Sequence, residues 1–226
     1  MFESATHGYD TLDHMHIDVR LGGDAAFDQL VAACRDMGLQ VMLDGVFNHV
    51  SRNHPAVQTA LDETAGRHSK SGRPTRWHGL VRAHVGDNGE PALDVFEGHG
   101  DLVALDHSAD ETVDYVAHVM SHWLDRGAAG WRLDAAYAVP SPFWARVLPQ
   151  VKAAHPYSWI FGEVIHGDYP RIIEESTMDS ITQYELWKSI QHALETENFF
   201  ELDWNLKRHN AFLDSFVPQT SSATMT

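Results

Sequence analysis

The stretch GWRLDAA (130–136) predicts a short buried strand that ends on a carboxylate. Arg132 lies two residues before Asp134, and side chains two residues apart point to the same side of a strand. A buried carboxylate is costly in free energy unless a cation or a hydrogen-bond donor accompanies it. We therefore expect Arg132 to pair with Asp134 and to keep that carboxylate ionised.

Two further strands are predicted to end on acidic residues. The run LQVMLDGVF contains Asp44, and the run SWIFGEV contains Glu163. Neither run alternates between apolar and polar residues, which is typical of strands buried on both faces of a parallel sheet. The stretch SITQYEL (180–186) is the fourth strand that we expect.

Helical apolar patterns precede three of these strands, at residues 24–38, 110–127 and 141–154. Alternating strands and helices predict an α/β fold, with helices outside a parallel sheet. A (β/α)₈ barrel and a doubly wound sheet both satisfy that rule. In a barrel the carboxyl ends of all strands converge on the face that holds the active site, which suits the three carboxylates. A doubly wound nucleotide-binding protein is disfavoured, because no glycine-rich turn follows any of the strands.

Residues 50–107 interrupt this order. The regular apolar pattern is absent there, and His, Gly, Arg and Asp residues are frequent. The segment is too long for a simple connection within a compact domain. We therefore predict an inserted subdomain over residues 50–107, within one catalytic unit that covers residues 1–226.

Composition limits the partners of the chain. Thirty-two acidic and sixteen basic residues give a formal net charge of −16, which argues against nucleic acid as a partner. No apolar run is long enough to span a bilayer, and no signal-peptide pattern is present. If Met1 is the true start, no membrane association and a cytoplasmic location are expected. Cys34 is the only cysteine, so no intrachain disulfide can form, and no feature predicts the oligomeric state.

The acidic residues at the strand ends suit a pair of catalytic roles. A carboxylate held ionised by an arginine suits a nucleophile, and a carboxyl group in a less charged setting suits a general acid. Asp134 and Glu163 fit this division, which glycoside hydrolysis requires. Asp44 is expected to be mainly a structural partner of Arg132. Taken singly, each residue could also be an ordinary turn, cap or loop residue, and His49 could satisfy a buried carbonyl, so the prediction depends on the set.

The set resembles the α-amylase family, glycoside hydrolase family 13, over nearly the whole chain. DGVFNH (Asp44–His49) is similar to the first conserved region of the family, GWRLDAA (Gly130–Ala136) to the second and FGEV (Phe161–Val164) to the third. GDLVALDH (Gly100–His107) resembles the region that closes the subdomain inserted after the third barrel strand. HGYDTLDH (His7–His14) resembles the segment that follows the second strand.

The resemblance implies a role for each residue of the site. Asp134 would be the nucleophile, and Glu163 the general acid and then the base. Arg132 would orient Asp134, while His49 and Tyr9 would hold the sugar, Tyr9 by stacking on its ring. Four further aromatic residues are expected to be either sugar platforms or core residues: Trp77, Phe96, Trp131 and Trp187.

The resemblance also raises the question of a metal. Asn48 matches a position that ligates a structural calcium in many members of the family. Asp106 is the only other oxygen ligand that can be named, whereas calcium takes six to eight. We therefore expect no required cofactor, with a structural calcium at Asn48 as the alternative.

Both ends of the chain depart from the family pattern. The fourth conserved region of the family contains a His followed by an Asp that stabilises the transition state. This region is expected after FVPQT (216–220), but the chain reads SSATMT (221–226) there. For one choice of codons, deleting one base from the coding sequence of the family stretch shifts the reading frame. The shifted frame then encodes these six residues. Met1 stands where the family commonly has a valine after the second strand. We therefore expect a partial (β/α)₈ barrel with about strands three to six, a fragment that lacks both ends.

The function implied is retaining hydrolysis of α-glucosidic bonds in α-glucans or maltooligosaccharides, with this chain a truncated, inactive form. Two alternatives stay open. One is a non-catalytic product, either a pseudogene fragment or a carbohydrate-binding remnant. The other is a transglycosylase or a trehalose-synthase-like sugar isomerase of the same family, because hydrolysis and transfer use the same two carboxylates.

Overall fold

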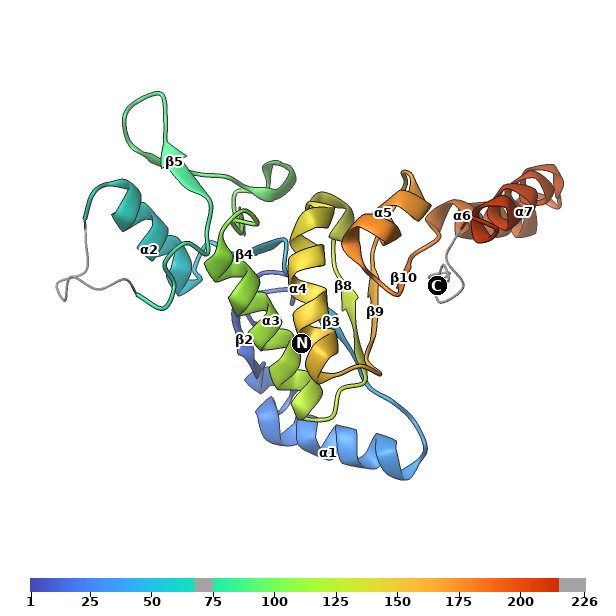
Figure 1. The fold of residues 1–226 in the computed structure, drawn as a ribbon, viewed down its shortest axis with the longest axis horizontal. Coiled ribbons are helices and arrows are strands. Elements are labelled where there is room, and N and C mark those ends of the chain that lie inside the picture. The colour runs from blue at the N-terminus through green and yellow to red at the C-terminus, as the bar shows by residue number, and fades with distance from the viewer. Residues whose placement is uncertain (68–74, 216–226) are drawn as a thin grey trace.

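The computed structural model describes residues 1–67 and 75–215, and its centre is a four-stranded parallel sheet (Figure 1). The strands follow the order β10-β9-β8-β3 across the sheet. Their bounds are β3 Met42–Gly45, β8 Gly130–Leu133, β9 Trp159–Gly162 and β10 Ser180–Ile181. A helix precedes each strand: α1 Gly23–Asp36, α3 Asp110–Asp125, α4 Ser141–Ala154 and α5 Tyr169–Ser176. The predicted α/β fold with a parallel sheet is confirmed.

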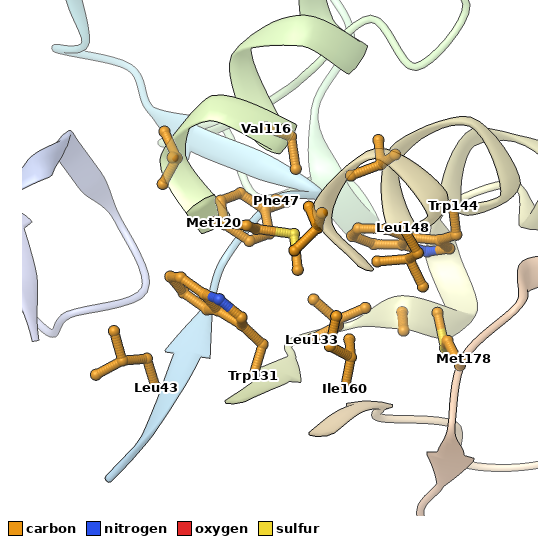
Figure 2. Close-up of a cluster of buried hydrophobic side chains, with 14 of the residues drawn as sticks. Leu43, Phe47, Val116, Met120, Trp131, Leu133, Trp144, Leu148, Ile160 and Met178 are labelled. Carbon is orange, nitrogen blue, oxygen red and sulfur yellow. The ribbon is translucent and has the colours of Figure 1, made fainter. Parts of the chain in front are cut away.

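Helices α3 and α4 cover one face of the sheet (Figure 1). Figure 2 shows the side chain of Trp131 from β8 in a cluster with Met120 of α3 and Leu148 of α4, and all three are fully buried. The opposite face is more open, because Met42 is 41% exposed and Trp159 is 40% exposed. The expectation that the strands are buried on both faces is therefore wrong. In a closed barrel, side chains from further strands fill this inner face.

The fourth strand is shorter than predicted. Only the first two residues of the stretch 180–186 pair with β9. Helix α6 (Tyr184–Thr196) begins within that stretch, and α7 (Phe200–Leu213) follows it. The buried positions of α6 are Leu186, Ser189 and Ala193. This spacing matches one face of a helix, so packing after Gln183 favours a helix over a longer strand. Together α6 and α7 project beyond the β10 edge of the sheet (Figure 1).

The chain between β3 and α3 forms a small unit beside the sheet (Figure 1). Its elements are β4 His49–Ser51, α2 Pro55–Thr64, β5 Ala83–Val85, β6 Pro91–Leu93, the 3₁₀ turn Phe96–Gly98 and β7 Leu102–Ala104. Strand β4 pairs with β7 and β5 pairs with β6, both antiparallel. Val50, Val57, Leu80, Val103 and Leu105 belong to a hydrophobic cluster separate from that of the sheet. The described part of residues 50–107 therefore has its own core.

An antiparallel hairpin opens the chain, formed by β1 (Phe2–Ser4) and β2 (Thr11–Ile17). Phe2 is buried, and its ring stacks on that of Trp131 at a centroid distance of 6.0 Å. No helix within residues 1–67 and 75–215 has both the length and the apolar character needed to cross a bilayer. The stretch 221–226, where the fourth family region is expected, lies outside the described residues.

Three buried histidines lie in the hairpin and at the start of the inserted unit: His14, His49 and His54. Burial lowers the pKa of His14 and of His49 to about 4 and the pKa of His54 to about 3. A histidine with a lowered folded-state pKa stabilises the protein above its unfolded pKa near 6.5 and loses that contribution as the pH falls. We therefore expect the free energy of unfolding to decrease as the pH is lowered from about 6.5 to about 4.

The variant His54→Asn should weaken this acid sensitivity. Nδ1 of His54 accepts the N–H of Ala56 (3.1 Å) at the start of α2, and asparagine is an equally good N-cap. Nε2 of His54 is buried without a hydrogen-bond partner in the described parts of the chain. The variant keeps the cap but removes a titrating group, so stability should fall less steeply with pH, by up to about 1.4 kcal/mol per pH unit. Urea unfolding at about pH 7 and pH 5 measures the slope. The exposed His166, replaced by Asn, is the control; equal slopes for wild type and His54→Asn would contradict the prediction.

Candidate active site

Three acidic residues lie at the carboxyl ends of neighbouring strands. Asp44 belongs to β3, and Asp134 and Glu163 follow directly after β8 and β9. Backbone hydrogen bonds hold these positions, because the N–H of Asp134 donates to the carbonyl of Gly45 and the N–H of Glu163 donates to that of Leu133, both at 2.9 Å. The backbone pairing therefore continues past the strand ends and brings all three carboxyl groups to one edge of the sheet.

Arg132 joins the three carboxylates. It lies opposite Asp44 in the β3–β8 pairing, and its Nη1 donates to both oxygens of Asp44, at 2.7 and 2.9 Å. Nη1 also donates to Oδ1 of Asp134 at 2.9 Å, and Nη2 lies 3.0 Å from Oε1 of Glu163. The predicted pairing of Arg132 with Asp134 is confirmed, and the same guanidinium also contacts the other two carboxylates.

Sharing one cation among three carboxylates alters the electrostatics of the site. Burial raises the pKa of Asp134 to about 6; Arg132 opposes this shift, and the negative charges of Asp44 and Glu163 add to it. Arg132 therefore favours the ionised form of Asp134, but burial and the two other carboxylates outweigh its effect on the pKa. Glu163 does not lie in a less charged setting either, because it contacts Arg132. Burial alone would lower the pKa of Arg132, but the hydrogen bond and charge of Asp44, followed by Glu163 and Asp134, raise it above its usual value.

Two further donors hold the carboxylate of Glu163. The hydroxyl of Tyr184 donates to Oε1 at 2.8 Å, and the N–H of Ala135 donates to Oε2 at 3.0 Å. Ala135 has a left-handed backbone with φ 47°, a conformation that costs a residue other than glycine about 1–3 kcal/mol. That backbone turn aims the N–H at Glu163. Sequence reasoning missed Tyr184, because it placed this residue inside a strand, where nothing distinguished it from its neighbours.

Tyr9 and His49 complete the network. The hydroxyl of Tyr9 lies 3.4 Å from Oδ2 of Asp44, and its side chain is 41% exposed. Nε2 of His49 donates to the backbone carbonyl of Tyr9 at 3.0 Å, and its Nδ1 accepts from Nδ2 of Asn48 at 3.1 Å. Burial lowers the pKa of His49 to about 4, so its imidazole is neutral near neutral pH. The structure thus brings Asp134, Glu163, Arg132, Tyr9, His49 and Asp44 into one network.

The surroundings of Asn48 do not fit a calcium ion. The amide nitrogen of Asn48 is engaged with His49. Asp106 accepts hydrogen bonds from Ser108 N (3.0 Å) and Oγ (2.6 Å) and is not part of the cavity wall beside Asn48, whereas the cation Arg82 is. Within residues 1–67 and 75–215, no three His, Cys, Asp or Glu side chains gather as a metal site would require. Calcium takes six to eight oxygen ligands, which these residues do not supply.

Of the four aromatic residues considered as sugar platforms, Phe96 contacts a residue of the site. The half-buried ring of Phe96 stacks on that of His49, with centroids 4.9 Å apart and an interplanar angle of 17°. Trp131 is fully buried in the core, and Trp77 packs against the core of the inserted unit. Trp187 lies on α6 and is 36% exposed.

Comparison with known proteins agrees with this arrangement. The family model for the alpha amylase catalytic domain matches residues 1–204. A cyclomaltodextrinase from a Bacillus species is 30% identical over 188 residues, which cover 81% of this chain and 32% of that protein. The intracellular maltogenic amylase of Bacillus subtilis is 29% identical over 167 residues, which cover 74% of this chain and 27% of that protein.

The fold is also found among solved structures. The ligand-free cyclic alpha-maltosyl-(1→6)-maltose hydrolase from Arthrobacter globiformis aligns with a TM-score of 0.82 at 24% identity. The alignment covers 99% of this chain and 50% of the hydrolase. The complex of that hydrolase with maltose aligns with a TM-score of 0.80 at 25% identity. This chain spans about a third of the length of the curated relatives that it matches. It belongs to the α-amylase family, glycoside hydrolase family 13, with residues 1–204 matching the catalytic domain of that family.

Proposed function

We propose that this chain carries the two catalytic carboxylates of a retaining glycoside hydrolase that cleaves α-glucosidic bonds in α-glucans or maltooligosaccharides. One observation carries the proposal: Asp134 and Glu163 lie at the ends of adjacent strands, and both contact the guanidinium of Arg132. Retaining hydrolysis needs two carboxyl groups at one bond. The names of the cyclomaltodextrinase and maltogenic amylase relatives, and the maltose complex of the related hydrolase, support an α-glucan substrate.

In this proposal Asp134 attacks the anomeric carbon and forms a glycosyl ester while Glu163 protonates the departing oxygen. Glu163 then takes a proton from water, which hydrolyses the ester. Glu163 accepts from three donors, and a carboxylate has about four lone-pair sites, so one site remains for a proton. The hydroxyl of Tyr184 can adapt, because it can turn from donor to acceptor. Release of sugar with retained anomeric configuration, and its loss in Asp134→Asn, test the proposal.

The other residues of the site bind the sugar or orient the catalytic side chains. Arg132 positions Asp134, and Asp44 holds Arg132 from the neighbouring strand. His49 and the exposed ring of Tyr9 contact the sugar beside the nucleophile. Tyr9 is fixed for this role at both ends, because its carbonyl accepts from His49 and its hydroxyl contacts Asp44.

We also propose that the sheet corresponds to barrel strands three to six, with residues 50–107 inserted after strand three. The half-exposed inner face of the sheet and the alignment over half of the Arthrobacter hydrolase support this assignment. Binding of maltooligosaccharides without turnover would identify a carbohydrate-binding remnant instead of an enzyme. The name of the intracellular Bacillus subtilis relative supports a cytoplasmic location.

We propose that no calcium is required. Chelation with EDTA should leave the thermal unfolding midpoint of the chain unchanged, because the cation Arg82 lines the same cavity as Asn48 and the described residues gather no group of three acidic, His or Cys side chains. A bound ion at 100 times its dissociation constant would stabilise the fold by about 2.7 kcal/mol, which thermal unfolding detects easily. A midpoint that falls with EDTA and returns with calcium, but not with magnesium, would show that the ion is bound.

A further inference from the structure

The two oxygens of the Glu163 carboxylate accept different numbers of hydrogen bonds. Oε1 accepts from the hydroxyl of Tyr184 at 2.8 Å and lies 3.0 Å from Nη2 of Arg132. In the described parts of the chain, Oε2 accepts one hydrogen bond, from the N–H of Ala135 at 3.0 Å. Each oxygen of a carboxylate offers about two lone-pair sites. Both sites of Oε1 are therefore occupied, and the free site of Glu163 is on Oε2.

The backbone around Tyr184 is fixed against the chain on both sides of Glu163. Thr182 lies between β10 and α6, two residues before Tyr184. Its N–H donates to the carbonyl of Gly162 at 3.0 Å. Its hydroxyl donates to the carbonyl of Val164 at 2.8 Å and accepts the N–H of Val164 at 2.9 Å. Because Gly162 and Val164 flank Glu163 in the chain, the first turn of α6 is held in place relative to this carboxylate before any substrate binds.

The hydroxyl of Tyr184 remains a donor. Burial raises the pKa of Tyr184, the hydrogen bond to Glu163 and the negative charge of Glu163 raise it further, and Arg132 opposes these effects. The ordinary pKa of tyrosine is already near 10, so the hydroxyl keeps its proton near neutral pH. When Glu163 carries a proton on Oε2, its Oε1 is still an acceptor, and Tyr184 need not turn.

We propose that Tyr184 is a positioning residue for Glu163: together with Arg132 it occupies Oε1, so that Glu163 gives and takes its proton at Oε2. In the first step, the proton on Oε2 moves to the glycosidic oxygen as the bond from that oxygen to the anomeric carbon breaks and an oxygen of Asp134 bonds to the carbon. In the second step, the oxygen of water bonds to the anomeric carbon, Oε2 takes a proton of that water, and the bond to Asp134 breaks. The inference rests on the proposed function, which assigns Glu163 but neither of its oxygens.

The variant Tyr184→Phe tests this role, because it keeps the ring but frees one lone-pair site of Oε1. A proton can then reside on the oxygen that contacts Arg132 instead of on Oε2. Steps that need Glu163 should slow by about 10- to 100-fold, which is part of the 10²–10⁴-fold that a general acid or base contributes. We expect kcat for maltotriose to fall by this factor and KM to change by less than about twofold.

The formation of the glycosyl ester from 5-fluoro-α-maltosyl fluoride should not depend on Tyr184. Fluoride departs without a proton, so this step does not use Glu163 as an acid. The rate at which Asp134 is labelled should therefore stay within about twofold of wild type in Tyr184→Phe. Unchanged labelling also shows that the site is folded in the variant. Tyr157→Phe is the matched control, because Tyr157 is 98% exposed.

Azide separates a positioning role from a merely structural one. Azide attacks the glycosyl ester without losing a proton, so it needs no base. In Tyr184→Phe, azide should speed the release of the label by about tenfold, with a maltosyl azide as the product. In wild type, where Glu163 activates water, azide should change the release by less than about twofold. Mass spectrometry measures the label on the protein and identifies the released sugar.

The outcomes separate this inference from the proposed function. If wild type is labelled and cleaves maltotriose, and Tyr184→Phe cleaves it as fast as wild type, Tyr184 does not position Glu163 and the proposed function stands. The inference is also overturned if labelling and cleavage fall by the same factor in Tyr184→Phe and azide restores neither. If wild type is not labelled and does not cleave maltotriose, the proposed function fails, and this inference fails with it.

Discussion

Incubating this chain with a 5-fluoro-α-maltosyl fluoride is expected to add one glycosyl group to Asp134 in wild type and none in Asp134→Asn. Fluoride departs without a proton, so the first step needs the nucleophile but not the acid. The ring fluorine destabilises the oxocarbenium-like transition state, so the ester is hydrolysed slowly and accumulates. An amide cannot replace the carboxylate as nucleophile, and the labelling rate should fall by more than about 10⁴-fold. Intact mass spectrometry followed by peptide mapping measures the label and its position.

Glu163→Gln should behave differently from Asp134→Asn. Labelling should persist, because fluoride needs no acid. Release of the label should slow by about 10²–10⁴-fold, because Glu163 is also the base that activates water. Asp44→Asn is the matched control, since Asp44 lies on the same guanidinium but is not assigned to the chemistry. A label on Asp44 or Glu163, or a label that survives in Asp134→Asn, would show that the nucleophile is misassigned.

Arg132→Leu is expected to lower the free energy of unfolding by about 3–5 kcal/mol near pH 7. The guanidinium is the cation that Asp44, Asp134 and Glu163 share, and its side chain is only 16% exposed. Without it, three carboxylates face one another in a partly buried site, and each must lose its proton against the charge of the others. Chemical unfolding of the variant and of wild type measures the difference.

The effect of Arg132→Leu should depend on pH. The pKa of Asp134 is already raised to about 6, and losing Arg132 would raise it further. A carboxyl group with a raised folded-state pKa stabilises the protein at low pH, and that contribution is lost as the pH rises. The variant should therefore be closest to wild type below about pH 5 and furthest from it above pH 7. Arg171→Leu is the control, because the side chain of Arg171 is 69% exposed and pairs with Glu175 at the surface, where ion pairs contribute about 0–1 kcal/mol. Equal pH slopes for the two variants would contradict this account.

The fold class and the carboxylate cluster could be predicted because both follow from local patterns. Apolar runs that end on Asp44, Asp134 and Glu163 indicate strands, and parallel strands bring their ends to one edge. The spacing of Arg132 and Asp134 likewise determines that both side chains lie on one side of a strand. These inferences need no knowledge of tertiary packing.

The remaining features depend on contacts between distant segments. The division of the charge of Arg132 among three carboxylates depends on how β3, β8 and β9 align, which no local pattern encodes. The hydrogen bond from Tyr184 depends on where β10 stops and α6 begins, and packing decides that boundary. The left-handed backbone of Ala135 has no sequence signal, because alanine rarely adopts it.

The alignment of the central strands has a consequence for how the protein folds. Arg132 lies opposite Asp44 in one neighbouring strand and opposite Phe161 in the other. A slip of one residue would turn every side chain of β8 to the other face, bringing the guanidinium into the apolar layer and Trp131 out of it. A misaligned sheet would then bury an unpaired charge and also lack its reactive centre. The residues assigned to catalysis therefore also disfavour a wrong strand register. Selection that keeps these residues for catalysis also selects against a misaligned sheet.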